Sequence, residues 1–178
     1  MTDPTGDPFV GTIIDDRYEV ISKIAEGGMG AVYKARRRLL EEIRVIKVMR
    51  PQLEHQEEIR SRFLREAKIA VQMRHANIAQ MYDFSIDEAG NSFIVMEFID
   101  GITLQDLLKR CGPPGVALTL EIAQQSLEAL GYLHRKGIVH RDISPDNLML
   151  SQDDQGNPAV KLIDLLAAIP SVVYGVWG

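Results

Sequence analysis

The nine residues Val139–Asn147 constrain the chain more than any other segment. Within them, Asp142 stands directly after His140 and Arg141 and five residues before Asn147. A carboxylate at the first position can accept the proton of a hydroxyl group, and an amide oxygen at the second can bind a magnesium ion that holds phosphates. Three residues in this order also recur by chance. The motif therefore gains weight only if the other parts of such a site stand before and after it.

Composition excludes several classes of protein. The chain has 178 residues, which suggests one domain or one domain and part of a second. Its net charge of -5 argues against a general nucleic-acid binder, so we expect no nucleic-acid partner. Cys111 is the only cysteine, which rules out an internal disulfide and fits a reducing compartment. We therefore expect a cytoplasmic protein.

The two ends of the chain differ from its middle. Residues 1–16 have neither a basic region nor an apolar run, so they predict a flexible acidic leader rather than a signal peptide. Residues 162–178 are apolar but include Asp164 and Pro170, and a membrane span needs about 20 apolar residues. We therefore expect no membrane segment in this chain.

The first half of the chain has the alternation typical of strands. Strands are predicted at residues 18–24, 31–35, 44–48, 78–85 and 92–97, and the glycine-rich residues 25–30 join the first two as a hairpin. A helix is predicted over residues 54–73, because its apolar residues recur at helical spacing.

The second half is mostly helical. Thr103 is the predicted N-cap of a short helix that ends near Arg110, and a longer helix is predicted over residues 119–136. One stripe of the longer helix holds Leu120, Ala123, Leu127, Leu130 and His134, and short strands are predicted at 148–150 and 160–163. The sequence thus predicts an α+β fold with two lobes. Its parts are a five-stranded antiparallel N-lobe with one helix (17–97), a hinge (98–101), a partial helical C-lobe (102–165) and an atypical apolar tail (166–178).

Two features of the first lobe suit phosphate binding. Gly27, Gly28 and Gly30 would let backbone N–H groups approach phosphate oxygens, although hairpin turns are also rich in glycine for steric reasons. Lys47 lies within an apolar strand, where its charge needs a partner. Glu66 of the following helix could be that partner, or it could lie on a solvated helix face.

These motifs, taken in order, resemble the protein-kinase superfamily and specifically the bacterial Ser/Thr kinases of eukaryotic type. The resemblance covers residues 17–165 and has five parts. The parts are the glycine-rich segment Glu26–Tyr33, the lysine of Arg44–Lys47, the helix segment Phe63–Ala67 with His75–Ile78, the hinge Ile94–Gly101 and the loop Val139–Asn147. The resemblance implies a protein-kinase-like two-lobe fold in which the helix over 54–73 is regulatory.

The resemblance also implies ATP and Mg²⁺ as cofactors and a protein with a Ser or Thr hydroxyl as substrate. Asp142 would deprotonate that hydroxyl, and Lys47, paired with Glu66, would hold the α- and β-phosphates. Asn147 and Asp164 would bind magnesium, which makes Asp142, Lys47, Glu66 and Asn147 the catalytic set. The implied ATP-binding residues are Ile24, Gly27, Gly28, Gly30, Val32, Val45, Lys47, Met96, Glu97, Ile99, Asp106 and Met149.

The sequence departs from the family pattern at four places. Ala25 replaces the first glycine of the glycine-rich loop, and Ser144 replaces a lysine that would touch the γ-phosphate. Leu166 stands where the metal-binding motif has glycine, which restricts the backbone after Asp164. Residues 166–178 contain no activation loop, so we expect a C-terminally truncated chain of weak or no activity whose long helix has uncovered apolar surface.

Three alternatives remain open beside a Ser/Thr kinase. The chain could be a non-catalytic, pseudokinase-like module that binds a nucleotide or a partner, which Leu166 favours. It could also be a degenerate product without a stable fold. A phosphotransferase acting on a small molecule is a more distant alternative, because the glycine-rich and hinge segments resemble those of protein kinases.

Overall fold

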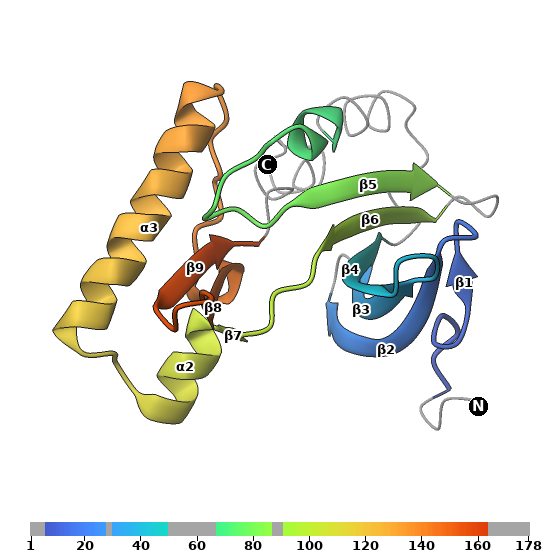
Figure 1. Ribbon diagram of the computed structural model, residues 1–178, viewed down its shortest axis with the longest axis horizontal. Helices are drawn as coiled ribbons and strands as arrows, with labels where there is room; N and C mark the ends of the chain where they lie inside the picture. Colours follow the sequence, from blue (N-terminus) through green and yellow to red (C-terminus); the bar gives the residue numbers. More distant parts are fainter. Residues whose placement is uncertain (1–5, 28–29, 50–66, 87–90, 164–178) are drawn as a thin grey trace, which may run out of the picture. The chain divides into compact units, whose positions relative to one another are not determined.

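The structure, a computed structural model, describes residues 6–27, 30–49, 67–86 and 91–163. These residues form two compact units, shown in Figure 1. The first unit contains the described residues up to Val71 together with residues 81–98. The second contains residues 72–80 and those from Ile99 onward.

The first unit is built on an antiparallel sheet. Its strands are β1 (Ile13–Ile14), β2 (Tyr18–Gly27), β3 (Gly30–Arg37), β4 (Glu42–Met49), β5 (Met81–Ile86) and β6 (Ser92–Glu97), in the order β1-β2-β3-β4-β6-β5. The predicted α+β class and antiparallel N-terminal sheet are confirmed, and the two-residue β1 is additional. β2 has two register irregularities and is strongly curved (Figure 1).

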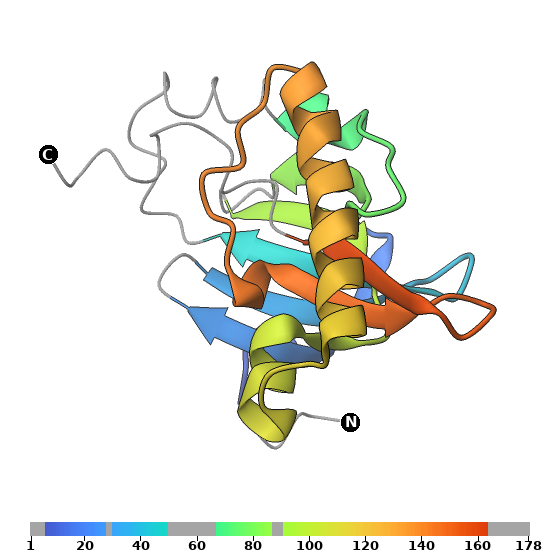
Figure 2. The same cartoon turned by 90° about the vertical axis from the view of Figure 1, so that its left-hand side faces the viewer.

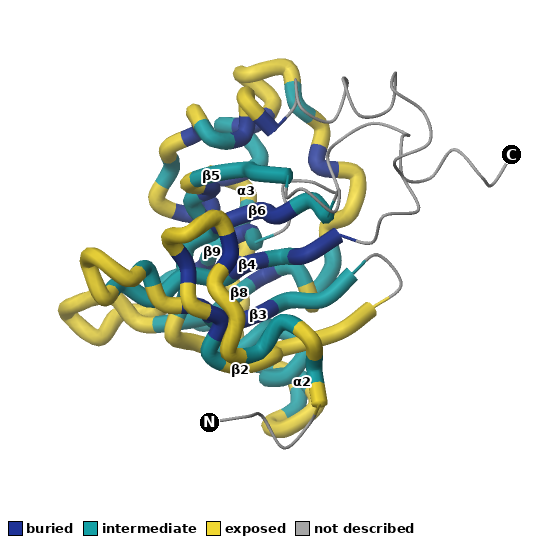
Figure 3. The backbone as a smooth tube through the Cα atoms, turned by 90° about the vertical axis from the view of Figure 1, so that its right-hand side faces the viewer, coloured by how far each residue is buried: buried dark blue, intermediate teal, exposed yellow. Residues whose placement is uncertain are grey.

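One face of this sheet carries the core of the unit. Along β4, Ile46 and Val48 are buried, whereas Val45 and Lys47 on the other face are half-buried. This alternation follows from the two-residue period of a strand. Buried segments of β3, β4 and β6 lie side by side in Figure 3. The core cluster consists of Ile14, Tyr18, Val20, Tyr33, Ala35, Ile46, Val48, Phe93 and Val95.

The fourth strand begins later than predicted. Residues 78–80 were expected in β5, but β5 begins at Met81. The preceding residues pair with the second unit's own sheet instead. Ala79 N–H donates to the carbonyl of Leu162 at 2.8 Å, and Leu162 N–H donates to the carbonyl of Asn77 at 2.9 Å. The alternating pattern of these residues predicts extended chain, but it does not indicate that Leu162 is the pairing partner.

The residues before β2 differ from the predicted flexible leader. Phe9 and Val10 pack against the core cluster, and β1 pairs with β2. Two backbone hydrogen bonds fasten the segment, from Gly11 N–H to the Val20 carbonyl (3.0 Å) and from Val20 N–H to the Thr12 carbonyl (2.9 Å). The described part of the predicted leader is therefore part of the sheet unit.

The second unit combines two helices with a small sheet. It contains β7 (Ile102–Thr103), α2 (Leu104–Cys111), α3 (Val116–Arg135), the 3₁₀ turn η2 (Pro145–Asn147), β8 (Leu148–Gln152) and β9 (Pro158–Leu162). The sheet has the order β7-β8-β9, and α3 packs along β9 (Figure 2). Thr103 caps α2 as predicted, because its Oγ1 accepts a 3.0 Å hydrogen bond from Asp106 N–H.

The long helix α3 has two apolar faces. The core face carries Ile122, Ala129 and Leu133, which are at most 7% exposed. The stripe noted in the sequence lies mostly on the other face, where Leu120 is 64% and Leu127 is 66% exposed. Of the predicted helix over 54–73, the structure describes residues 67–73, and the helix ends at residue 71, two residues earlier than predicted. No helix in the described ranges is long and apolar enough to span a membrane.

Candidate active site

The register of the first sheet brings four predicted ATP-binding residues onto one face. Val32 pairs with Lys47, and Val45 pairs with Met96. Residues paired directly across antiparallel strands project from the same face, and so do residues two apart on one strand. Val32, Val45, Lys47 and Met96 therefore share the face opposite the core cluster. This face therefore has three apolar side chains beside the charged Lys47. Such a face suits a ligand that has a flat apolar part and an anionic part.

Three predicted site residues lie outside the described residues. They are Gly28, Glu66 and Asp164. The Lys47–Glu66 ion pair and the metal-binding role of Asp164 stay predictions. Lys47 itself is half-buried at the middle of β4, with Val32 on one side and Ile94 on the other.

Position 30 requires glycine because the backbone of β4 passes close to it. Its φ is +149°, and a Cβ atom built there would lie 2.0 Å from the carbonyl oxygen of Val48. At Gly27 a Cβ would have no neighbour within 4 Å. The sequence left two reasons for these glycines open, namely the approach of backbone N–H groups to phosphates and the steric demands of a turn. At Gly30 a steric reason is present. Ile24, a predicted ATP-binding residue, lies at a register irregularity of β2 and is 51% exposed.

The loop after α3 joins Asp142 to Asn147. Nδ2 of Asn147 donates to the carbonyl oxygen and to Oδ2 of Asp142, both at 2.9 Å. Asp142 is exposed and Asn147 is half-buried. The turn η2 sets this spacing, because Asn147 N–H also donates to the carbonyl of Ser144 at 3.1 Å. The two residues that the motif singled out are thus in direct contact.

His140 and Arg141 shape the start of this loop. His140 is 1% exposed, and its Nδ1 accepts a 3.4 Å hydrogen bond from Asp142 N–H. Arg141 has a φ of +64°, a left-handed conformation that costs a non-glycine residue about 1 kcal/mol. The loop therefore maintains a strained residue directly before Asp142, a pattern that clusters at functional sites.

Asn147 has one side-chain oxygen of the kind that magnesium prefers, and its role in binding magnesium stays a prediction. Because Nδ2 is used on Asp142, the side-chain oxygen Oδ1 of Asn147 faces away from those bonds, and Mg²⁺ prefers oxygen ligands. Ile163, which directly precedes Asp164, donates its N–H to the carbonyl of Asn147 at 3.0 Å. Within the described residues no three His, Cys, Asp or Glu side chains form a metal cluster.

The remaining predicted residues are distributed over both units. Glu97 ends β6 in the first unit, whereas Ile99 is the first residue of the C-terminal part of the second unit. Asp106 lies in the first turn of α2, and Met149 lies in β8 opposite Thr103 and Lys161. Their joint role at one nucleotide stays a prediction.

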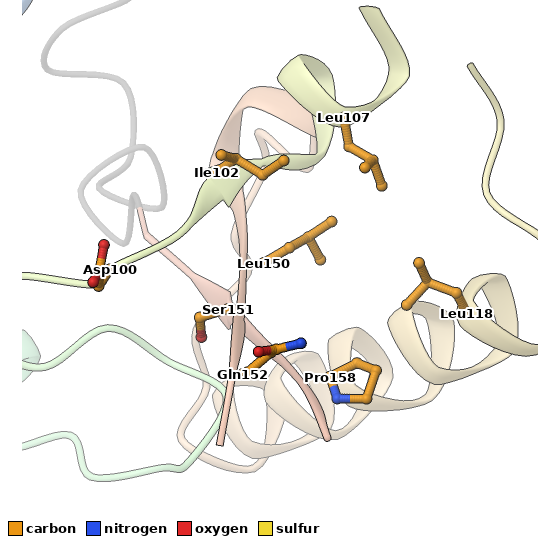
Figure 4. A pocket seen from close by; sticks show the side chains of 8 residues that line it. All are labelled: Asp100, Ile102, Leu107, Leu118, Leu150, Ser151, Gln152 and Pro158. Atoms are coloured by element: carbon orange, nitrogen blue, oxygen red, sulfur yellow. The ribbon is translucent and has the colours of Figure 1, made fainter. Parts of the chain in front are cut away.

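The second unit also has an open apolar cavity, with a volume of about 520 Å³ (Figure 4). Leu107 of α2, Leu118 of α3 and Leu150 of β8 point toward it, and Asp100 lies at its edge. None of the predicted catalytic, ATP-binding or metal-binding residues lines it. It is therefore separate from the loop that carries Asp142.

The sequence reading missed one polar cluster. Asp7, Lys23, Glu26 and Tyr33 are joined by hydrogen bonds and ion pairs in the first unit. Asp7 and Tyr33 are 26 residues apart, and Asp7 belongs to no motif. No local pattern in the sequence could have indicated this contact.

Comparisons with known proteins agree with this geometry. The family model "Protein kinase domain" matches residues 18–169. The chain is 38% identical over 164 residues to the serine/threonine-protein kinase pkn3 of Myxococcus xanthus, which covers 92% of this chain and 30% of the relative. The chain thus spans less than a third of that relative's length.

Two solved structures have the same fold. A double mutant of the PknI kinase domain of Mycobacterium tuberculosis matches with a TM-score of 0.76 and 28% identity, over 88% of this chain and 63% of that one. Rad53, in complex with AMP-PNP, matches with a TM-score of 0.74 and 29% identity, over 84% of this chain and 38% of that one. The fold, the loop and the match over residues 18–169 together establish that this chain belongs to the protein kinase family, with relatives among the bacterial serine/threonine kinases.

Proposed function

We propose that the chain carries the ATP-binding and catalytic-loop part of a cytoplasmic serine/threonine protein kinase. The reaction would transfer the γ-phosphoryl group of ATP to a Ser or Thr hydroxyl of a protein. The observation that carries the proposal is the contact between Asp142 and Asn147 at the end of a strained loop. A carboxylate and an amide held together in this way can serve proton transfer and metal binding at adjacent positions.

The residues of this chain have distinct roles in that reaction. The Asp142 carboxylate accepts the proton of the substrate hydroxyl, and its contact with Asn147 fixes its orientation. Lys47 holds the α- and β-phosphates, and Val32, Val45 and Met96 contact the base from the same sheet face. Asn147 and Asp164 would hold magnesium, which would supply positive charge beside the phosphates. The AMP-PNP bound to the similar Rad53 supports a nucleotide as the ligand.

Two measurements on the full chain test the proposal. The first is transfer of label from γ-labelled ATP to a generic Ser/Thr protein, and the second is thermal unfolding with and without Mg-ATP. Nucleotide at about 100 times its Kd should stabilise a binding-competent fold by about 2.7 kcal/mol. We expect Asp142→Ala to abolish transfer but keep the thermal shift, and Lys47→Met to lose both.

Asp146→Ala is the matched control. It removes an exposed acid from the same loop, so transfer should continue. A thermal shift without any transfer would favour the alternative, a non-catalytic module that binds nucleotide, for which Leu166 is a specific reason. Transfer that persists in Asp142→Ala would contradict the assigned role.

A further inference from the structure

A buried carboxylate anchors the segment before β1 to the sheet. The Asp7 side chain is 6% exposed. Its oxygens accept hydrogen bonds from Phe9 N–H (3.0 Å) and from the Tyr33 hydroxyl (3.1 Å), and Lys23 Nζ lies 3.0 Å from Oδ2. Burial raises the pKa of Asp7, but these donors outweigh it and hold that pKa below its ordinary value. A buried carboxylate that accepts several hydrogen bonds is held in one position, unlike a solvated charge on the surface.

Aromatic packing strengthens the same anchor. The Phe9 ring lies 5.6 Å from the Tyr33 ring and 6.1 Å from the Phe93 ring, measured between centroids. Offset or edge-on ring pairs at these distances are favourable. The segment is therefore held on the core face of the sheet by both polar and apolar contacts.

Lys23 links Asp7 to Glu26 near the end of β2. Its Nζ lies 2.5 Å from Oε2 of Glu26, and the hydrogen bonds to Glu26 and then to Asp7 raise the pKa of Lys23. Lys23 and Glu26 flank the register irregularity between Lys23 and Ala25, where β2 bends. Glu26 directly precedes Gly27, which pairs with Gly30. Asp7, Lys23 and Glu26 thus form a chain of ion pairs that ends beside the glycine-rich turn.

The end of β2 is exposed to solvent. Its last six residues are exposed, whereas Tyr18 and Val20 at its start are buried. Among the described residues, the ladder to β3 and the ion pair between Lys23 and Glu26 hold this strand end in place. A strand end with few buried contacts opens easily unless polar contacts restrain it.

We propose that Asp7 is a positioning residue that acts through Lys23 and Glu26 to fix the glycine-rich end of β2, and so sets the affinity for the nucleotide phosphates. The part of this inference that concerns nucleotide rests on the proposed function. The part that concerns the strand end does not.

Asp7→Asn tests the inference, with Asp15→Asn as matched control. Both remove one negative charge from the same N-terminal segment, but Asp15 pairs with Arg17, not with Lys23. We expect Asp7→Asn to speed amide hydrogen exchange at residues 24–27 and 30–32 by about tenfold, because one charge-assisted hydrogen bond is lost. Exchange in β4 and β6 should not change. The Kd for Mg-ATP, measured well below the unfolding temperature, should rise by a similar factor. Asp15→Asn should change neither quantity.

A double-variant cycle separates positioning from general stabilisation. If Asp7 acts through Lys23, Asp7→Asn should have little further effect on exchange in a Lys23→Met background, since interacting residues are not additive. Additive effects, or exchange at the strand end that matches wild type, would overturn the inference. If wild type binds no Mg-ATP, the proposed function fails, and the exchange data alone decide whether Asp7 positions the strand end.

Discussion

Nδ2 of Asn147 lies 2.9 Å from both the carbonyl oxygen and Oδ2 of Asp142. Both partners are acceptors, so only a donor group can bridge them. Asn147→Ala should lose these bonds and lower the free energy of unfolding by about 1 kcal/mol at pH 7. Asn147→Asp should also place a second carboxylate beside Asp142 and be more destabilising at pH 7.

Urea unfolding of both variants at pH 7 checks this, because only Asn147→Asp adds repulsion between two carboxylates. Equal free energies of unfolding for Asn147→Asp and Asn147→Ala at pH 7 would mean that the side chains at 142 and 147 are not in contact.

The two described glycines beside the glycine-rich turn should respond differently to alanine. Gly30→Ala would place a Cβ atom 2.0 Å from the Val48 carbonyl at a φ of +149°, so the β3–β4 ladder must shift. We expect a loss of about 2–3 kcal/mol in the free energy of unfolding. Gly27→Ala meets no atom within 4 Å and should cost less than about 1 kcal/mol. Equal losses in chemical denaturation would contradict the close approach.

Local patterns in the sequence predicted much of the fold. The predicted strand over residues 44–48 is present within β4, and its period of two explains why Ile46 is in the core and Lys47 is on the other face. The Asp142–Asn147 spacing predicted a loop that joins those residues. Both features depend on residues close in sequence, and both are present in the structure.

Contacts between distant segments could not be predicted in this way. Asp7 meets Tyr33 across 26 residues, and Ala79 pairs with Leu162 rather than extending β5. Helix α3 is apolar on two faces, so its period alone could not choose Leu133 over Leu127 as the core residue. In each case the tertiary partner decides, and no single segment contains that information.

Gln125 joins three parts of the second unit. Its Oε1 accepts hydrogen bonds from Asn77 Nδ2 and Val160 N–H, both at 2.8 Å, and its Nε2 donates to the Pro158 carbonyl at 2.9 Å. Val160 is 1% exposed, so Gln125→Ala should leave a buried N–H without an acceptor and cost about 2 kcal/mol.

The neighbouring Gln124 provides the control on the same helix. It is exposed and bonds only to Glu128 among the described side-chain contacts, so Gln124→Ala should change stability by less than about 0.5 kcal/mol. Thermal unfolding of both variants checks the difference. Equal shifts would show that helix propensity, rather than the hydrogen bonds, is responsible.

Tyr33 should make stability depend on pH above 10. Burial, and then its hydrogen bond to Asp7, raises the pKa of Tyr33 to about 12 from an ordinary value near 10. The neutral phenol is therefore favoured in the folded protein, and its contribution is complete below pH 10 and is lost as pH rises to 12. Tyr33→Phe lacks this ionisation but also lacks the hydrogen bond. The difference in unfolding free energy between wild type and Tyr33→Phe should consequently shrink by about 2 kcal/mol between pH 10 and pH 12. Other ionising groups act on both proteins and cancel in the difference, so a gap that stays constant over this range would mean that Tyr33 is neither buried nor bonded to Asp7.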